Sequence, residues 1–320
     1  MKNNKKVIAI VICVILILLS NFIYDFLKVI TIGIEILKIN KSLPAVSCDF
    51  YSNPIEDVTY KDIVFKKRGD TELKLDIYSA NKEIDNGNPV IIYVYGDGWI
   101  GGSKTLPNSI KPLIDVLRNE GYTIISTSYE LMKDAIIFDK QISDIKDTIR
   151  WVNKYKDEYS LDTSKIGIIS PSAGAQLSMV AAYSDKLEFK GEDSLYGYNT
   201  NVNYIVDLFG PSILSEINLS EAPKEIVDKL TAEKIEELSK EYSPMNYLKE
   251  GVCDTLVIHS KSDSIVPYNT SLKLYNKAIE LNNDFELYSL ENSSHYLDNL
   301  DQKEAFQLYF KIISFIIKKT

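Results

Sequence analysis

The sequence predicts an α/β protein whose central sheet is mostly parallel and flanked by helices. From about residue 60 onward, short runs rich in β-branched residues alternate with segments of helical periodicity, which is the pattern of βαβ units. One run, residues 89–95, is apolar almost throughout and is typical of a strand buried on both faces of a sheet. With 320 residues, the chain is long enough for one such domain and a short N-terminal appendage.

The elements expected from this pattern begin with two closely spaced strands, which suit an antiparallel hairpin at the edge of the sheet. Helices and strands then alternate as far as the C-terminus, and the longest helix carries apolar residues at helical spacing on one face. The expected strands cover residues 64–67, 73–78, 89–95, 122–128, 165–170, 204–209, 255–259 and 285–290, and the expected helices cover residues 113–120, 139–159, 173–183, 272–281 and 304–317.

The spacing of these elements also predicts how the chain is divided. About forty-five charged and helical residues separate the strands at 204–209 and 255–259, far more than the roughly 2–6 residues of an ordinary connection. We therefore expect a small cap inserted at about residues 211–248. The folded domain then covers residues 60–320, and residues 39–59 form a linker to the N-terminal segment.

The N-terminal segment, residues 1–38, has the composition of a membrane anchor. Three lysines precede the uncharged run 7–24, whose 18 residues would span about 27 Å as a helix, against a hydrocarbon core of about 30 Å. Lysines before the span favour a cytoplasmic N-terminus, so we expect a single-pass protein whose folded domain lies outside the cytoplasm. Residues 26–37 suit a helix at the membrane interface. The competing interpretation is a cleaved signal peptide and a secreted protein, although no small-residue cleavage site ends the run.

Charge and cysteine usage exclude several classes of partner and cofactor. The formal net charge is −9 and basic blocks are missing, whereas binding to nucleic acid requires clustered Lys and Arg. The three cysteines show no C-x-x-C spacing, so neither a structural zinc site nor a disulfide framework is indicated. The P-loop pattern is also missing. These features therefore indicate no nucleic-acid partner, no structural zinc site and no P-loop nucleotide site.

Ser172 is the candidate nucleophile. It stands at the centre of Ser-Pro-Ser-Ala-Gly, residues 170–174, between a predicted strand and a predicted helix, where a nucleophile elbow exposes its serine at the end of a sheet. Small residues are needed two positions either side because strand and helix approach closely there, and Ser170 replaces the glycine that is usual at the first of them. A serine at such a turn is equally suited to capping the helix N-terminus.

A glycine cluster, Tyr-Gly-Asp-Gly-Trp at residues 95–99, follows the buried strand. Acyl transfer places negative charge on a carbonyl oxygen, so the site needs preorganised backbone N–H donors, and glycines let the backbone approach. We expect the amides of Asp97, Gly98 and Ala173 to form this oxyanion hole. Glycines of the same segment also match G-x-G-x-x-G, but a dinucleotide site needs a helix that opens directly at them, and the next predicted helix begins at residue 113.

The candidate base and acid follow from the fact that the chain holds only two histidines. His295 lies in a polar loop after the last predicted strand, where a general base belongs, whereas His259 ends an apolar strand and is expected to be packed and hydrogen-bonded. Asp263 lies in the loop after that strand, where a carboxylate would orient the imidazole, although it also suits an ordinary turn. The chain order Ser172, Asp263, His295 is that of the α/β-hydrolase fold.

Residues 95–104 resemble the H-G-G-G-W-x-x-G-x-K motif of carboxylesterases related to hormone-sensitive lipase and of bacterial feruloyl-esterase-like hydrolases. The resemblance extends from about residue 63 to the C-terminus and implies an α/β-hydrolase fold, hydrolysis of short acyl esters and no cofactor. Two positions depart from the motif: Tyr95 replaces its histidine, and Asp97 replaces a frequent glycine. A tyrosine hydroxyl can replace the histidine's hydrogen bond, whereas the carboxylate of Asp97 would oppose the oxyanion if it pointed inward. Further matches run from residues 121–122 through 128–129 and occur at Asp144 with residues 150–151, at residues 172–175 and 209–212, and at Asp263 with residues 266–268.

These observations predict a serine carboxylic-ester hydrolase that acts on a small-molecule ester through an acyl-enzyme. Ser172 is the expected nucleophile, His295 the general base and Asp263 the acid that orients it. One alternative is a serine peptidase of the same fold, although no propeller-like or prolyl-specific segment supports it. The other is a catalytically silent hydrolase fold that serves as a membrane-tethered binding module, which the departures from the family motifs favour.

Overall fold

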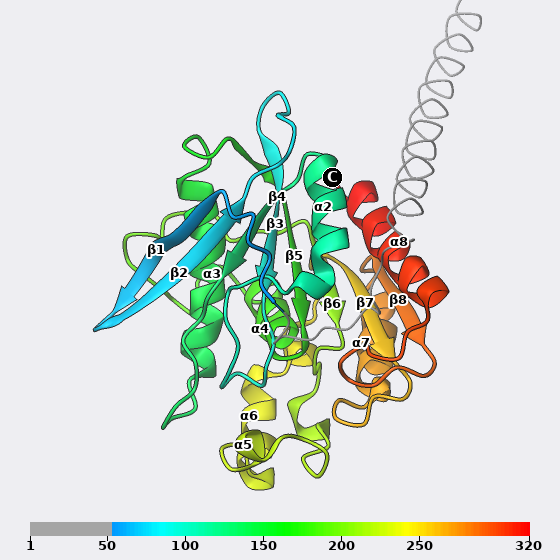
Figure 1. Ribbon diagram of the computed structural model, residues 1–320. Coiled ribbons are helices and arrows are strands. Elements are labelled where there is room, and N and C mark those ends of the chain that lie inside the picture. Colours follow the sequence, from blue (N-terminus) through cyan, green and yellow to red (C-terminus); the bar gives the residue numbers. More distant parts are fainter. Residues whose placement is uncertain (1–52) are drawn as a thin grey trace, which may run out of the picture.

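The computed structural model describes residues 53–320, which form an eight-stranded, mostly parallel sheet with helices on both faces (Figure 1). In chain order the strands are β1 (Tyr60–Arg68), β2 (Thr71–Tyr78), β3 (Asn88–Val94), β4 (Thr123–Thr127), β5 (Leu161–Pro171), β6 (Tyr204–Leu208), β7 (Asp254–Ser260) and β8 (Phe285–Leu290). Their order in the sheet is β1-β2-β4-β3-β5-β6-β7-β8. β2 pairs antiparallel with both β1 and β4, and the remaining neighbours are parallel. The predicted fold class and edge hairpin are confirmed.

Helices cover both faces of this sheet. In chain order they are α2 (Lys111–Asn119), α3 (Phe138–Lys154), α4 (Ser172–Tyr183), α5 (Lys224–Val227), α6 (Ala232–Tyr242), α7 (Tyr268–Glu280) and α8 (Gln302–Lys318). α2 and α8 lie side by side on one face (Figure 1), where Phe315 of α8 packs edge-on against Tyr204 of β6. α3 and α4 pack together on the other face. On that face, the hydroxyl of Tyr183 in α4 lies 2.8 Å from the hydroxyl of Thr255 in β7. Thr255 pairs with Ile205, the neighbour of Tyr204. Because successive residues of a strand point to opposite faces, Thr255 and Tyr204 lie on opposite sides of the sheet.

The hydrophobic pattern explains which strands lie in the middle of the sheet. Every residue of β3, β4 and β6 is buried, as expected for apolar strands with helices on both faces. β1, at the open edge, is largely exposed and carries several charged side chains, which discourage pairing with another chain. The carboxyl ends of the buried parallel strands therefore provide the fixed edge on which a site can be built.

The main difference from the predicted elements follows α3. The sequence pattern predicted a helix over 139–159, but α3 ends at Lys154. Tyr159 packs instead against Trp151, with ring centroids 5.4 Å apart. The next residue, Ser160, has a φ of 53°, which a continuing right-handed helix does not allow. The aromatic side chains beyond α3 thus belong to a separate cluster, which the helical spacing could not distinguish from the helix face.

The chain between β6 and β7 forms a cap at one end of the sheet, within the predicted insertion at 211–248. It contains α5, α6 and two short 3-10 turns, η3 (Leu214–Glu216) and η4 (Pro244–Tyr247). Figure 1 shows α5 and α6 close together beyond the end of α4. The side-chain amide of Gln176 in α4 donates to the carbonyl of Tyr242 at the end of α6, over 2.8 Å. The cap is thereby fastened to α4.

The predicted anchor and interfacial helix, residues 1–38, lie outside the described residues, as does most of the predicted linker. The described end of that linker packs on the domain: Ile55 is buried, and its amide donates to the carbonyl of Leu106 over 2.9 Å. Within residues 53–320, none of the helices combines the length and the apolar character that crossing a membrane requires.

Candidate active site

Ser172 occupies the sharp turn between β5 and α4. Its φ of 49° lies in the left-handed region, which costs a non-glycine residue strain energy. Behind it, a Cβ added to Gly174 would lie only 2.3 Å from the carbonyl oxygen of Tyr95. A side chain has no room there, so the elbow holds α4 directly against the chain that leaves β3. This close approach explains the small residue two positions after the serine.

The structure brings together the three side chains proposed as nucleophile, base and acid. The Oγ atom of Ser172 lies 2.9 Å from Nε2 of His295, and Nδ1 of the same ring lies 2.7 Å from Oδ2 of Asp263. An ionised carboxylate only accepts hydrogen bonds, so Nδ1 carries the hydrogen and Nε2 is left to accept from the hydroxyl of Ser172. His295 is buried, and the ring of Phe209 packs edge-on against it at 4.8 Å. This arrangement fits a hydroxyl that is activated by a fixed imidazole.

The environment of Asp263 keeps its carboxyl ionised. Burial alone would raise the pKa of Asp263, but hydrogen bonds from His259 and His295 outweigh this effect, and the pKa lies well below its usual range. The other carboxylate oxygen, Oδ1, accepts from the amides of Ile265 and Val266, both over 2.9 Å. The carboxylate can therefore stabilise positive charge on His295.

His259 lies in β7, where it is fully buried and hydrogen-bonded, as the apolar strand predicted. Sequence reasoning missed that its Nε2 lies 3.1 Å from Oδ2 of Asp263, the same atom that His295 contacts. The two histidines thus meet at one carboxylate oxygen. The spacing of His259 and Asp263, four residues apart across the end of a strand, was the available indication, but only the structure shows that the chain folds back between them.

The loop after β3, residues 95–99, lies beside Ser172 and contains two of the proposed oxyanion donors, Asp97 and Gly98. We call this segment the oxyanion loop. Three consecutive residues, Asp97, Gly98 and Trp99, have φ values of 80°, 62° and 65°, so the loop forms a tight left-handed turn. The indole nitrogen of Trp99 donates to the side chain of Gln176 over 2.9 Å, which ties the loop to α4. The amide of Ala173 belongs to the first turn of α4, where N–H groups have no partner within the helix. Asp97 and Gly98 line the same cavity as Ser172, and Ala173 follows the serine directly in sequence, so all three proposed donor residues lie next to the nucleophile.

A small cavity of about 50 Å³ lies at Ser172 and His295. The cap closes it: a Cβ added to Gly98 would lie 2.3 Å from Cδ1 of Ile226, so this side chain of α5 rests on the oxyanion loop. The wall is largely apolar, and it includes Ile217, Ile226 and Ile265. Within residues 53–320, the acidic, histidine and cysteine side chains form no group arranged to hold a metal ion.

Comparison with protein families gives a match to the BD-FAE family over residues 75–278, which is well over half of the chain. The chain belongs to the BD-FAE family. The matched region begins in β2 and ends in α7, so it contains the elbow, the oxyanion loop, the cap and Asp263, whereas His295 follows it.

Individual relatives of this BD-FAE chain are distant. It is 23% identical over 199 residues to esterase LipC of Mycobacterium tuberculosis, a match that covers 60% of this chain and 49% of LipC. The chain therefore spans about half the length of this curated relative. Among solved structures, a truncated carbohydrate esterase from gut microbiota is 26% identical with a TM-score of 0.67, covering 83% of this chain and 98% of that one. The butyrate-bound thermophilic esterase of Thermogutta terrifontis, 21% identical with a TM-score of 0.68, covers 82% and 94% and shares the fold.

The structure accounts for the positions at which this BD-FAE chain departs from the H-G-G-G-W motif. Tyr95 stacks on Tyr129 with ring centroids 4.4 Å apart, and each hydroxyl donates to the main chain of the other residue, over 3.3 and 3.2 Å. This pair fixes the start of the oxyanion loop. The carboxylate of Asp97 lies against Gly101, where an added Cβ would be 2.3 Å from Oδ2. Ser170 fits in place of the elbow glycine, fully buried, and its hydroxyl makes no hydrogen bond within residues 53–320.

Proposed function

We propose that this chain is a serine carboxylic-ester hydrolase that acts on short-chain acyl esters. The observation that carries the proposal is the continuous hydrogen-bond relay from Ser172 through His295 to Asp263, at the carboxyl ends of three different strands. Membership of the BD-FAE family supports the same class of reaction. The similarity to LipC, an esterase, supports it as well.

In the first half of the proposed reaction, the Oγ atom of Ser172 attacks the ester carbonyl while Nε2 of His295 takes its proton. The resulting imidazolium is stabilised by the ionised Asp263. Negative charge develops on the carbonyl oxygen, and the amides of Asp97, Gly98 and Ala173 are the proposed donors to it. His295 then returns the proton to the departing alcohol, which leaves an acyl group on Ser172.

In the second half, His295 activates a water molecule, which attacks the acyl-enzyme and releases the acid. The same oxyanion donors serve both steps, because each passes through a tetrahedral intermediate on the same carbonyl carbon. The relay begins and ends with the hydroxyl of Ser172 protonated and Asp263 ionised. Apart from the ester and the attacking water, these steps use only side chains and main-chain amides of the chain.

The size of the cavity at Ser172 supports a short acyl group. At about 10–15 Å³ for each water-sized group, its volume of about 50 Å³ holds roughly three to five non-hydrogen atoms. An acetyl to butyryl group fits this range. The side chain of Ile226 closes the cavity from the cap, so a longer chain would require the cap to move.

The proposal is tested with the full-length chain in detergent, using p-nitrophenyl acetate and butyrate together with a fluorophosphonate probe. We expect turnover of both esters and labelling that is lost in Ser172→Ala. Labelling that survives in Ser172→Ala would refute the nucleophile assignment. A folded wild-type chain that is neither labelled nor active would favour the silent binding module instead.

We further propose that residues 7–24 form an uncleaved, single-pass membrane anchor with the hydrolase domain on the outer side. The support is the length of this apolar run and the lysines that precede it. Mass spectrometry of the protein purified from membranes should find the original N-terminus. A mature chain that begins after Ser20 would show instead that the segment is a signal peptide.

A further inference from the structure

Both histidines of the chain contact the same carboxylate oxygen. Nδ1 of His295 lies 2.7 Å from Oδ2 of Asp263, and Nε2 of His259 lies 3.1 Å from the same atom. The reaction proposed above uses only His295. We propose that His259 is a positioning residue of this relay, whose ring N–H fixes the orientation of Asp263. This inference rests on the proposed function.

The neighbours of the His259 ring determine its tautomer. Nε2 lies 2.9 Å from the carbonyl oxygen of Val266, which only accepts hydrogen bonds, as does the carboxylate of Asp263. Nε2 therefore carries the hydrogen and shares it between these two oxygens. On the other side of the ring, Nδ1 lies 2.7 Å from Oγ of Ser271 in α7, whose hydroxyl donates to it. A neutral ring of this tautomer holds Asp263 without competing with His295 for its negative charge.

The hydrogen bonds to Asp263 show what His259 adds. Oδ1 is held by the amides of Ile265 and Val266. With these two bonds alone, the carboxylate could rotate about Oδ1, and the position of Oδ2 would not be fixed. His295 keeps its Nδ1–H in both charge states, but it becomes an imidazolium twice in every catalytic cycle, so its attraction for Oδ2 changes during turnover. The bond from His259 does not depend on that change, so it keeps Oδ2 in line with Nδ1 of His295 throughout.

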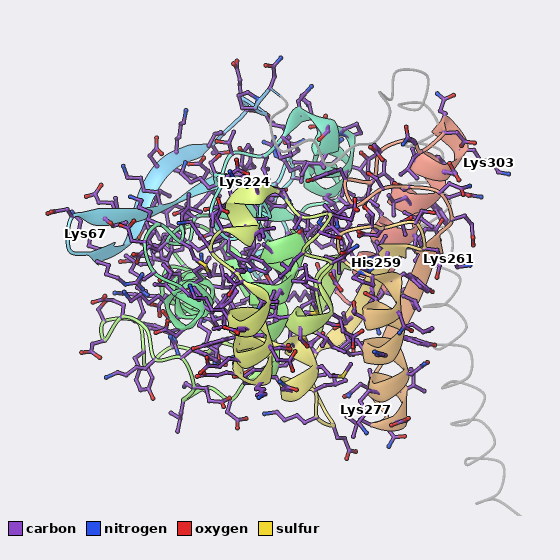
Figure 2. The ribbon with its side chains drawn as sticks, turned by 90° about the horizontal axis from the view of Figure 1, so that it is seen from below. Lys67, Lys224, His259, Lys261, Lys277 and Lys303 are labelled. Atoms are coloured by element: carbon purple, nitrogen blue, oxygen red, sulfur yellow. The ribbon has the colours of Figure 1, made fainter. Side chains whose placement is uncertain are left out.

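Two further titratable groups pack near the His259 ring. Tyr268 of α7 lies edge-on to it, with ring centroids 6.0 Å apart. Asp207 of β6 is fully buried and interacts with His259 electrostatically; one of its oxygens accepts from the amide of Gly210, and the other makes no hydrogen bond within residues 53–320. Burial raises the pKa of Asp207 to about 7, so below that pH Asp263 supplies most of the negative charge beside the ring. Figure 2 shows His259 among closely packed side chains beside α7.

The tautomer can be tested without turnover, because only two histidines contribute ring signals. The full-length chain in detergent micelles would be labelled with ¹⁵N-histidine, and its ring-nitrogen NMR signals recorded from about pH 5 to about pH 9, the range over which histidines titrate. Comparison with His259→Gln assigns the two rings. We expect His259 to be neutral and protonated at Nε2 near pH 8, with His295 protonated at Nδ1. A His259 ring protonated at Nδ1 would overturn the proposal.

The positioning role is tested by the pH dependence of turnover. In His259→Leu we expect kcat for acetate esters to fall about tenfold with KM nearly unchanged. The acidic limb of the rate profile should move up by about half to one pH unit, because Asp263 then loses a donor that offsets its charge. His259→Gln should restore most of both, since the glutamine amide can reach the same acceptors. The control is Thr255→Val on the same strand, which loses its bond to Tyr183 and should lower stability without moving the limb.

Two results would overturn the inference: a folded His259→Leu chain with the wild-type kcat and acidic limb, or equal losses in the leucine and glutamine variants. If the leucine variant does not fold, Ser271→Ala takes its place, because it removes the donor to Nδ1 and should move the limb in the same direction by less. Failure of the proposed function gives a different result, namely a wild-type chain that neither hydrolyses esters nor reacts with a fluorophosphonate. In that case the ring-nitrogen spectra still decide between the two tautomers.

Discussion

Shortening Ile226 to alanine should change which acyl chains the site accepts. This side chain lies on the cap, and its Cδ1 atom is 2.3 Å from where a Cβ on Gly98 would be, so it rests on the oxyanion loop beside the nucleophile. It also lines the cavity of about 50 Å³ at Ser172. The substitution removes three carbon atoms from the wall and leaves the catalytic side chains in place.

The size of the effect follows from the acyl carbon atoms that the enlarged cavity can bury. Each buried methylene contributes about 0.8 kcal/mol, so two additional methylenes contribute about 1.6 kcal/mol, or roughly a 15-fold change. We therefore expect the ratio of kcat/KM for p-nitrophenyl hexanoate to that for p-nitrophenyl butyrate to rise roughly 15-fold in Ile226→Ala. Activity on acetate should change little, because an acetyl group already fits.

The matched control is Ile235→Ala, which makes the same change at a buried isoleucine elsewhere in the cap, in α6, whose side chain does not line the cavity. It should destabilise the cap without changing the hexanoate-to-butyrate ratio. The reasoning is refuted if the ratio is unchanged in Ile226→Ala, or if it rises equally in both variants. The second result would mean that looseness of the cap, rather than the volume beside Ser172, sets the acyl length.

Three further predictions concern the residues around this cavity. Asp263→Asn should keep its fold but lose about 10³–10⁴-fold in kcat, because the imidazole loses the partner that fixes its tautomer, and steady-state kinetics with circular dichroism would check both parts. Gly174→Ala should lower the free energy of unfolding by about 1–3 kcal/mol in urea titrations, since its methyl group would lie 2.3 Å from the carbonyl oxygen of Tyr95; a wild-type midpoint would contradict this close approach. Burial raises the pKa of Asp207 from 3.8 to about 7, so the stability it contributes is complete below about pH 4 and is lost as the pH rises through about 7. Asp207→Asn should therefore show a flatter dependence of unfolding free energy on pH between these limits than the wild-type chain. An equally steep dependence in both chains would argue against a raised pKa at Asp207.

The sequence predicted those features of the fold that depend on local pattern. Apolar runs predicted the buried strands, because a strand with helices on both faces has no solvent-exposed side that would carry polar residues. The order of Ser172, Asp263 and His295 along the chain placed each at the end of a predicted strand, and parallel strands bring such ends together. Three side chains far apart in sequence could therefore be expected at one edge of the sheet, where the structure brings them together.

Features that depend on tertiary packing could not be predicted in this way. The helix expected over 139–159 ends early because Trp151 packs with later aromatic residues, and helical spacing alone cannot separate such a cluster from a helix face. The bond from His259 to Asp263 depends on how the chain turns after β7. The contact of Ile226 with the oxyanion loop depends on how a cap of short helices folds over the sheet. In each case the partner is chosen by packing rather than by periodicity.

The distribution of backbone strain indicates which parts of the site are fixed and which can adapt. Asp97, Trp99 and Ser172 all have positive φ values, and such non-glycine conformations cost about 1–3 kcal/mol each and persist only where the surrounding structure holds them. Two hydrogen bonds hold Trp99 in this conformation. Its indole N–H donates to the side chain of Gln176, and its main-chain carbonyl accepts from the side chain of Gln141 over 3.0 Å. Gln176 in turn holds the end of α6. The nucleophile and the oxyanion loop are therefore rigid, whereas α5 contacts the loop through apolar side chains such as that of Ile226. Differences in acyl preference should accordingly arise from substitutions in the cap, without a change in the relay.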